Sequence, residues 1–239
     1  MSKKNKDNKE NKAVPKTQDK KKGKKKGAAP CGLYIKIGPD IDLETVTKDL
    51  KQILFVINRS EYERNMHALE VNGDFSDKDF TEKARLVITM AKQGGLATLV
   101  RGTAEHAETV EADGVLTLNL EDMKEAKSNL GEEAIVGLYC GLSQDDAAAA
   151  YDAGADFVSF GTKSSSPPAP DTLKFWNMLT DKPAVVEGHI TNDYCAYYVQ
   201  AGAGFIDAGD YIWSVGRGVM QGTVNMLHAI ELALDEMRT

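Results

Sequence analysis

The sequence predicts an α/β protein built as a (β/α)8 TIM barrel with parallel strands. Short apolar runs alternate with charged or amphipathic segments that have the length of helices. Strict alternation of this kind predicts a parallel sheet. The number of runs, eight, is the strand count of a barrel. A doubly wound open sheet is the alternative, but no Gly-x-Gly-x-x-Gly motif follows the first run, which weakens its nucleotide-binding version.

The most regular unit lies at residues 135–161 and reads as strand, helix, strand. Residues 135–141 form an apolar run that ends in glycine, and residues 155–161 form a second one. Between them, Ser143 is expected to cap a helix whose first turn carries Asp145 and Asp146, where the helix dipole favours acids. Gly154 is expected to end that helix. So short a crossover indicates a parallel, right-handed βαβ unit.

The other elements follow the same alternation along the chain. Further strands are expected at residues 33–38, 53–57, 96–100, 114–118, 184–187 and 205–208, as apolar runs covered on both faces by helices. A long charged connection is expected at residues 58–74. Further helices are expected at residues 42–51, 76–93, 103–111, 121–130, 172–180, 191–201 and 217–237.

Residues 1–30 are expected to form a disordered basic tail, and residues 31–239 the barrel domain. Residues 1–27 hold 12 Lys and no Arg against three acidic residues, whereas the remainder holds 17 basic and 33 acidic residues. The tail has too few apolar residues to offset the entropy of ordering it. Clustered Lys attracts polyanions, so the tail is expected to contact RNA or an anionic surface. A merely solubilising extension is the alternative, because the tail lacks Arg and aromatic residues.

Composition also bears on the compartment. No apolar run approaches the roughly 18 residues of a membrane span, and no signal-peptide region is evident. The three cysteines are widely separated and form no Cys-x-x-Cys motif, which argues against a disulfide framework or a cysteine zinc site. We therefore expect a cytoplasmic protein, and a homo-oligomer is compatible with the sequence.

In a barrel, functional side chains lie at the carboxyl ends of the strands, and phosphate often binds after strands seven and eight. Arg59 would follow the second strand, Lys163 the sixth, Gly188 and His189 the seventh, and Gly209 the eighth. Basic side chains and glycine amides hold phosphate, so these residues are expected to bind small phosphorylated molecules. The alternatives are solvated rim charges for Arg59 and Lys163, and a partly buried, hydrogen-bonded side chain for His189.

Two further side chains at the strand ends have structural expectations. Glu187 ends the seventh strand, and a carboxylate buried there would need Lys36 or Arg101 as its partner. Cys140 is expected to be an inert packing thiol.

Residues 137–141, 152–161 and 183–190 resemble the thiamine phosphate synthase family, most closely its divergent alphaproteobacterial members. Residues 111–115 resemble the fourth strand of that family, and residues 208–213 resemble the end of its last strand. The resemblance implies a TIM-barrel transferase of thiamine biosynthesis. Such an enzyme joins a pyrimidine methyl diphosphate to a thiazole phosphate and releases pyrophosphate, with no side-chain nucleophile.

The resemblance also implies Mg²⁺ as cofactor, and the family motifs for it are altered here. The family's third strand ends in Asn-Asp, whose Asp binds Mg²⁺, whereas Arg101 and Gly102 stand at that place. Asp122, or Glu121, could keep the second ligand role. The alternative is that Asp122 is an acid in the first turn of a helix, where the dipole favours it.

Two phosphate-binding motifs of the family are altered as well. The family's Thr-x-Thr-Lys loop is replaced by residues 162–168, so Lys163 is out of the family's position. The family's Gly-Gly after the seventh strand is Gly188-His189. These departures support a second hypothesis, in which a catalytically diverged, phosphate-ligand-binding or accessory barrel associates with RNA or an assembly through its tail.

Overall fold

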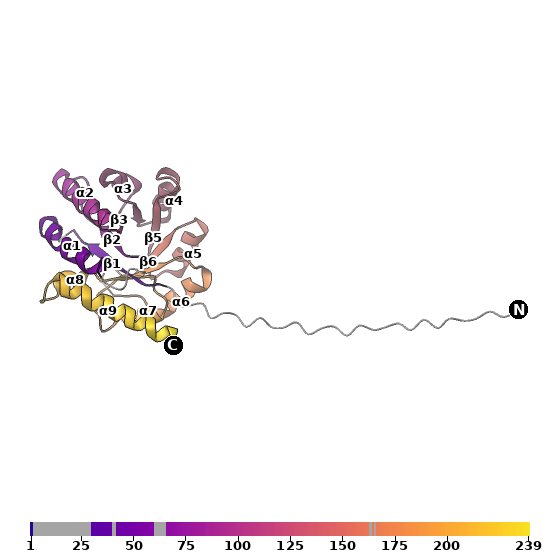
Figure 1. Ribbon diagram of the computed structural model, residues 1–239. Helices are drawn as coiled ribbons and strands as arrows, with labels where there is room; N and C mark the ends of the chain where they lie inside the picture. Colours follow the sequence, from indigo (N-terminus) through magenta and orange to yellow (C-terminus); the bar gives the residue numbers. More distant parts are fainter. Residues whose placement is uncertain (2–29, 40–41, 60–65, 163, 165) are drawn as a thin grey trace.

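The computed structural model describes residue 1 and residues 30–39, 42–59, 66–162, 164 and 166–239. The predicted basic tail, apart from its first and last residues, and Lys163 lie outside these described residues. Within them, eight parallel strands pair in chain order and close into a barrel (Figure 1), which confirms the predicted fold. The strands are β1 (Gly32–Ile37), β2 (Ala68–Val71), β3 (Ala97–Arg101), β4 (Gly114–Thr117), β5 (Ile135–Gly141), β6 (Phe157–Phe160), β7 (Ala184–Val186) and β8 (Phe205–Asp207).

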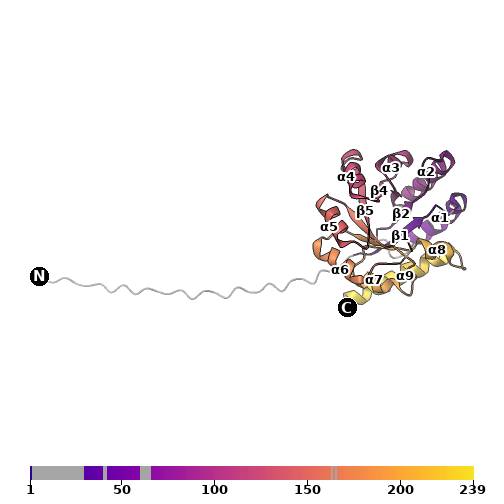
Figure 2. The same ribbon diagram turned by 180° about the vertical axis from the view of Figure 1, so that it is seen from behind.

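Helices surround the barrel on its outer side, as opposite views show (Figures 1 and 2). The last and longest, α9, packs against α1, α7 and α8 near the closure of the barrel. Within the described residues, no helix combines the length and apolarity that crossing a membrane requires. The helices are α1 (Leu43–Ile57), α2 (Lys78–Gln93), α3 (Ala104–Val110), α4 (Leu120–Asn129), α5 (Gln144–Asp152), α6 (Pro170–Leu179), α7 (Cys195–Gln200), α8 (Gly209–Ser214) and α9 (Val219–Arg238).

The β5–α5–β6 unit has the expected helix signals. The side chain of Ser143 accepts a hydrogen bond from the backbone N–H of Asp146 at 3.0 Å, which satisfies one unpaired donor of the first turn. Gly154 follows α5 with a φ of 86°, a left-handed conformation that glycine adopts without steric cost. The unit is therefore specified by local sequence.

The second strand was predicted at residues 53–57, and that prediction is wrong because these residues form the last turns of α1. The buried residues of α1 are Leu43, Val46, Leu50, Ile53 and Ile57, whose spacing is that of one helical face. The true β2 lies inside the stretch that was expected to be a charged connection. A short apolar run thus belongs to a helix, and a strand that contains a glutamate is central to the barrel.

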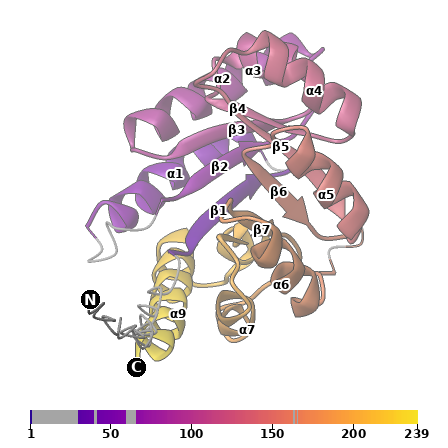
Figure 3. The same cartoon turned by 90° about the vertical axis from the view of Figure 1, so that its right-hand side faces the viewer.

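The barrel closes through β1, which pairs with β2 on one side and β8 on the other. Its amino-terminal half is filled by a small inner core. The larger core is made of buried residues from the strands and from the surrounding helices. Figure 3 shows the strands with the helices around them. The inner core comprises Tyr34, Ala68, Leu99, Leu116, Phe157 and Val185. Because apolar side chains fill that half, polar side chains of the barrel interior gather at the carboxyl ends of the strands.

Candidate active site at the barrel mouth

A cavity of about 520 Å³ opens at the carboxyl ends of the strands. Its volume falls within the range of small-molecule sites. Residues from β1, β3 and β5 and from the segments that follow β2, β4, β5, β6 and β7 contribute to it. They are Lys36, Asn72, Arg101, Leu118, Tyr139, Cys140, Gly141, Asp146, Thr162 and Glu187.

Arg101 is the central cation of this mouth, and its side chain is only 11% exposed. Its Nε lies 2.8 Å from Oε1 of Glu70, and its Nη2 lies 3.1 Å from Oε2 of the same carboxylate. The same Nη2 lies 2.6 Å from Oε1 of Glu187. The guanidinium also lies over the ring of Tyr139, at 5.2 Å from its centroid. The paired bonds to Glu70 fix the plane of the guanidinium.

Lys36 is the second cation and joins β1 to the last two strands. Its Nζ lies 2.7 Å from Oδ2 of Asp207 and 3.3 Å from Oε2 of Glu187. Glu187 therefore bridges Lys36 and Arg101, which confirms both partners expected for it. Burial disfavours the charged ammonium, but Asp207 and Glu187 outweigh that effect and hold the pKa of Lys36 above its usual value. Lys36 can thus act as a cation, not as an amine nucleophile.

Neutral donors complete the hydrogen bonding of the carboxylates of Glu70, Glu187 and Asp207. The Tyr34 hydroxyl donates to Glu70 at 2.5 Å, the Ser159 hydroxyl donates to Glu187, and the backbone N–H of Gly209 donates to Asp207 at 3.0 Å. With the two cations, these donors reach every oxygen atom of Glu70, Glu187 and Asp207. We call these three acids and two cations the mouth network.

Burial and charge set the proton affinities in the mouth network. Burial raises the pKa of Asp207 to about 6, against the opposing effect of Lys36. Burial alone would also raise the pKa of Glu187, but Arg101 and Lys36 hold it below its usual value. Burial raises the pKa of Cys140 to about 12, consistent with the expected inert thiol. Glu187 is therefore ionised at neutral pH, and Asp207 is the group nearest to titration.

Gly188, His189 and Gly209 come together beside the mouth network, at the ends of β7 and β8. Gly188 has a φ of 141°, which only glycine adopts without strain. The alternative of a partly buried His189 does not hold, because its side chain is 70% exposed; its Nδ1 lies 2.8 Å from Oδ2 of Asp210. A side chain on Gly209 would meet the backbone oxygen of Lys36 at 2.6 Å, so Gly209 is required for packing against β1.

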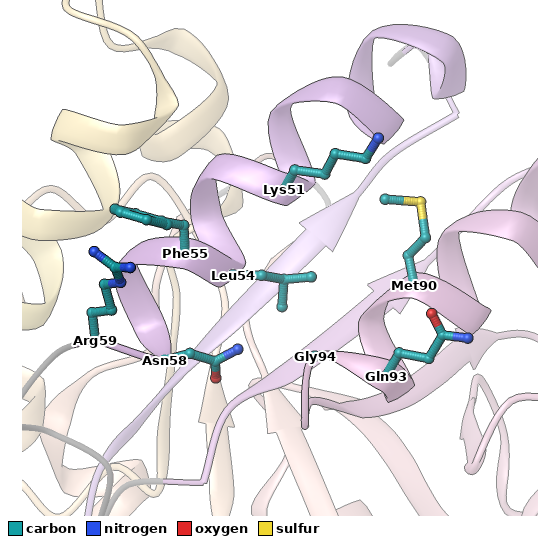
Figure 4. A pocket seen from close by; sticks show the side chains of 8 residues that line it. All are labelled: Lys51, Leu54, Phe55, Asn58, Arg59, Met90, Gln93 and Gly94. Atoms are coloured by element: carbon teal, nitrogen blue, oxygen red, sulfur yellow. The ribbon is translucent and has the colours of Figure 1, made fainter.

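Arg59 lies at the opposite end of the barrel, because it follows the end of α1 and not the end of a strand. Helix α1 returns the chain from the carboxyl end of β1 towards the amino end of β2. The guanidinium of Arg59 lies 4.3 Å from the ring centroid of Phe55, beside an outer hollow between α1 and α2 (Figure 4). The expected place of Arg59 at the mouth is therefore wrong.

Asp122 and Glu121 lie in the first turn of α4, and neither lines the mouth cavity. Asp122 accepts a hydrogen bond from the side-chain amide of Asn119 at 2.8 Å. It lines a separate hollow between α3 and α4 together with Glu105 and Glu125. Among the residues that the structure describes, no three Asp, Glu, His or Cys side chains are grouped so that they could hold a metal ion.

Comparison with known proteins assigns the chain to a family. The family model described as thiamine monophosphate synthase matches residues 44–209, which is more than half of the chain. The chain belongs to the thiamine monophosphate synthase family. The matched region runs from α1 to the start of α8 and includes seven strands of the barrel.

Curated members of the thiamine monophosphate synthase family show the same relationship. The thiamine-phosphate synthase of Hyphomonas neptunium is 31% identical over 193 residues, which cover 76% of this chain and 86% of that protein. The thiamine-phosphate synthase of Erythrobacter litoralis is 35% identical over 130 residues, but these span only 61% of that protein. The thiamine phosphate pyrophosphorylase structure from Pyrococcus furiosus shares the fold, with a TM-score of 0.66 at 18% identity over 87% of this chain and 98% of that one.

Four residues that belong to the mouth network or donate to it through their side chains were not expected from the sequence: Tyr34, Glu70, Ser159 and Asp207. Three of them lie inside apolar strands, where their polar groups point into the barrel. Glu70 was missed because the second strand was predicted at residues 53–57, so that the segment containing Glu70 was assigned to a connection. An acid flanked by apolar residues within a short strand is the signal that could have revealed it, since a buried carboxylate requires a partner.

Proposed function

We propose that the protein is a transferase of thiamine biosynthesis that joins a pyrimidine methyl diphosphate to a thiazole phosphate at the barrel mouth. The family match across almost the whole barrel carries this proposal. The mouth cavity has the size of a small-molecule site and lies at the strand ends, where the active sites of such barrels are found.

The reaction requires no nucleophilic side chain and no proton transfer from the protein. The C–O bond between the pyrimidine methylene and the diphosphate breaks, and its electron pair leaves on pyrophosphate. The lone pair of the thiazole nitrogen then forms the new C–N bond, and the nitrogen becomes cationic without losing a proton. The protein must orient the two substrates and stabilise the negative charge of the departing diphosphate.

We assign that charge stabilisation to donors that the mouth network leaves free. The Nζ of Lys36 uses two of its three N–H groups on carboxylates, and Arg101 bonds through Nε and Nη2. Within the part of the chain that the structure describes, one N–H of Lys36 and the Nη1 group of Arg101 thus remain for a phosphorylated ligand. Asn72 and Thr162 line the same cavity with neutral donors. On the neighbouring rim, Gly188 and His189 are proposed contacts for phosphate. Lys163, which lies outside the described residues, is proposed as a third contact.

The direct test mixes the purified protein with both substrates and measures thiamine phosphate by mass spectrometry. Product above a no-enzyme control would support the transferase. No product at any tested pH or protein concentration would reject it.

The second candidate is a diverged barrel that binds a phosphorylated ligand without turnover. The observation that favours it is the charge of the mouth network, in which three acids face only two cations. An excess of negative charge opposes a diphosphate. Saturable binding of the thiazole phosphate by calorimetry, combined with absence of product, would distinguish this candidate from the transferase.

We also propose that the Lys-rich tail contacts a polyanion such as RNA, in a compartment that keeps thiols reduced. The charge of residues 1–27 supports the first point, and three free, buried cysteines support the second. Binding to single-stranded RNA that is lost on deletion of residues 2–29, and that weakens with salt, would support the contact. Binding unchanged by the deletion would refute it.

A further inference from the structure

We infer that the guanidinium of Arg101 takes the place of a divalent cation in this chain, so that ligand binding and turnover at the mouth need no Mg²⁺. The inference about turnover rests on the proposed function, whereas the inference about metal binding stands on the mouth network itself. It concerns Arg101, which together with Gly102 stands where the family resemblance places the Asn-Asp pair.

The carboxylate oxygens of the mouth network do not fit a metal ion, because each of them already accepts a hydrogen bond from a cation or a neutral donor. Glu70 is held by both Arg101 and Tyr34, and Glu187 by Arg101, Lys36 and Ser159. The remaining acid, Asp207, is held by Lys36 on one oxygen and by the backbone N–H of Gly209 on the other. Mg²⁺ prefers an octahedral shell of oxygen atoms and binds through carboxylates that carry no competing cation. It would therefore have to displace Lys36 or Arg101.

Displacement of Arg101 is unfavourable because the guanidinium is anchored on two sides. Glu70 is fully buried, and its two oxygens match the planar fork of the guanidinium. Glu187, directly after β7, accepts a hydrogen bond from the same Nη2 at 2.6 Å, and the guanidinium lies over the ring of Tyr139. Removal of one partner of such a buried pair leaves an uncompensated charge.

Other acids near the mouth do not rebuild the missing site. Besides Glu187, Asp146 is the acid that lines the mouth cavity, and it lies in the first turn of α5, outside the mouth network. Asp122 is bonded to Asn119 and faces the hollow between α3 and α4. A fixed guanidinium differs from a metal ion in that it contacts a ligand by directed N–H bonds and is always charged.

The first experiment measures Mn²⁺ binding by electron paramagnetic resonance, because Mn²⁺ reports the sites that Mg²⁺ would occupy. The wild-type protein is compared with Arg101→Asp, which introduces an acid beside Glu70 and Glu187 and removes the guanidinium that holds them. Arg238→Asp, the same charge change on the exposed end of α9, is the matched control. We expect no saturable binding to the wild type or the control, and one site per chain in Arg101→Asp, bound at least about tenfold more tightly.

Two results would overturn the inference. One is a wild-type Mn²⁺ site that Glu187→Gln abolishes, since that site would lie in the mouth. The other is a folded Arg101→Asp protein, verified by circular dichroism, that gains no site. If Arg101→Asp does not fold, Mn²⁺ binding to the wild type and to Glu187→Gln decides: absence of a wild-type site supports the inference, and a wild-type site that Glu187→Gln abolishes overturns it. A wild-type site that persists in Glu187→Gln lies elsewhere, and the decision then passes to turnover.

The second experiment measures thiamine phosphate formation by the wild-type protein in EDTA and in Mg²⁺. An unchanged rate in EDTA supports the inference, and a rate that is lost in EDTA and restored by Mg²⁺ overturns it. Absence of product under both conditions rejects the proposed transferase but not the inference about the metal, which the Mn²⁺ measurement then decides alone.

Discussion

The mouth network predicts a large loss of stability when Glu70 is replaced by alanine. Glu70 is fully buried and receives three hydrogen bonds, two from Arg101 and one from the buried Tyr34 hydroxyl. Breaking a buried ion pair typically costs about 3–5 kcal/mol, and an orphaned buried hydroxyl costs about 1–3 kcal/mol. Because Arg101 keeps Glu187 as a partner, we expect a total of about 3–5 kcal/mol.

The assay is urea unfolding followed by circular dichroism. For an m-value near the upper end of about 1–3 kcal/mol/M, the expected cost lowers the midpoint by about 1–2 M. Glu82→Ala is the matched control, since Glu82 is exposed on α2 and its loss should leave the midpoint unchanged. Equal midpoints for the two variants would refute the view that the network stabilises the fold.

Three further predictions concern individual groups of the mouth. Because burial raises the pKa of Asp207 from 3.8 to about 6, the folded state binds a proton more readily in that window and loses stability as pH rises through it. The stability difference between wild type and Asp207→Asn should therefore fall from pH 3.8 to about 6, by at most about 1.4 kcal/mol per pH unit, and stay level above; a level difference throughout would contradict the raised pKa. With a pKa of about 12, Cys140 should react with iodoacetamide at pH 8 far more slowly than in urea-unfolded protein, and equal rates by mass spectrometry would contradict its burial. Gly188→Ala should lower the thermal midpoint through about 1–3 kcal/mol of backbone strain, whereas Gly216→Ala, where a side chain meets open space, should not.

The local features of the fold were predictable because neighbouring residues determine them. The Ser143 cap, the Gly154 end of α5 and the two strands around that helix each follow from a few adjacent residues. The second strand was not predictable from its apolarity, because the most apolar run of that region belongs to α1, where Ile53 and Ile57 lie on the buried face and Phe55 is exposed. Tertiary packing thus decided between helix and strand where local pattern did not.

The location of the mouth at the carboxyl ends of the strands was predictable, but only some of its ion pairs were. Glu187 was expected to need Lys36 or Arg101, and it contacts both. The bond between Lys36 and Asp207 joins residues 171 positions apart, and the bond between Arg101 and Glu70 depends on the register of β2. Contacts of this range follow from the closure of the barrel, and local sequence carries no signal for them.

The measurement that tests the account most directly compares product formation by two matched variants. Thiamine phosphate is measured by mass spectrometry for the wild type, Lys36→Gln at the mouth and Arg59→Gln at the opposite end of the barrel. The account predicts product from the wild type and Arg59→Gln, and a severe loss in Lys36→Gln, because Lys36 lines the cavity and Arg59 does not. A wild type without product, or a loss in Arg59→Gln with Lys36→Gln unaffected, would contradict it.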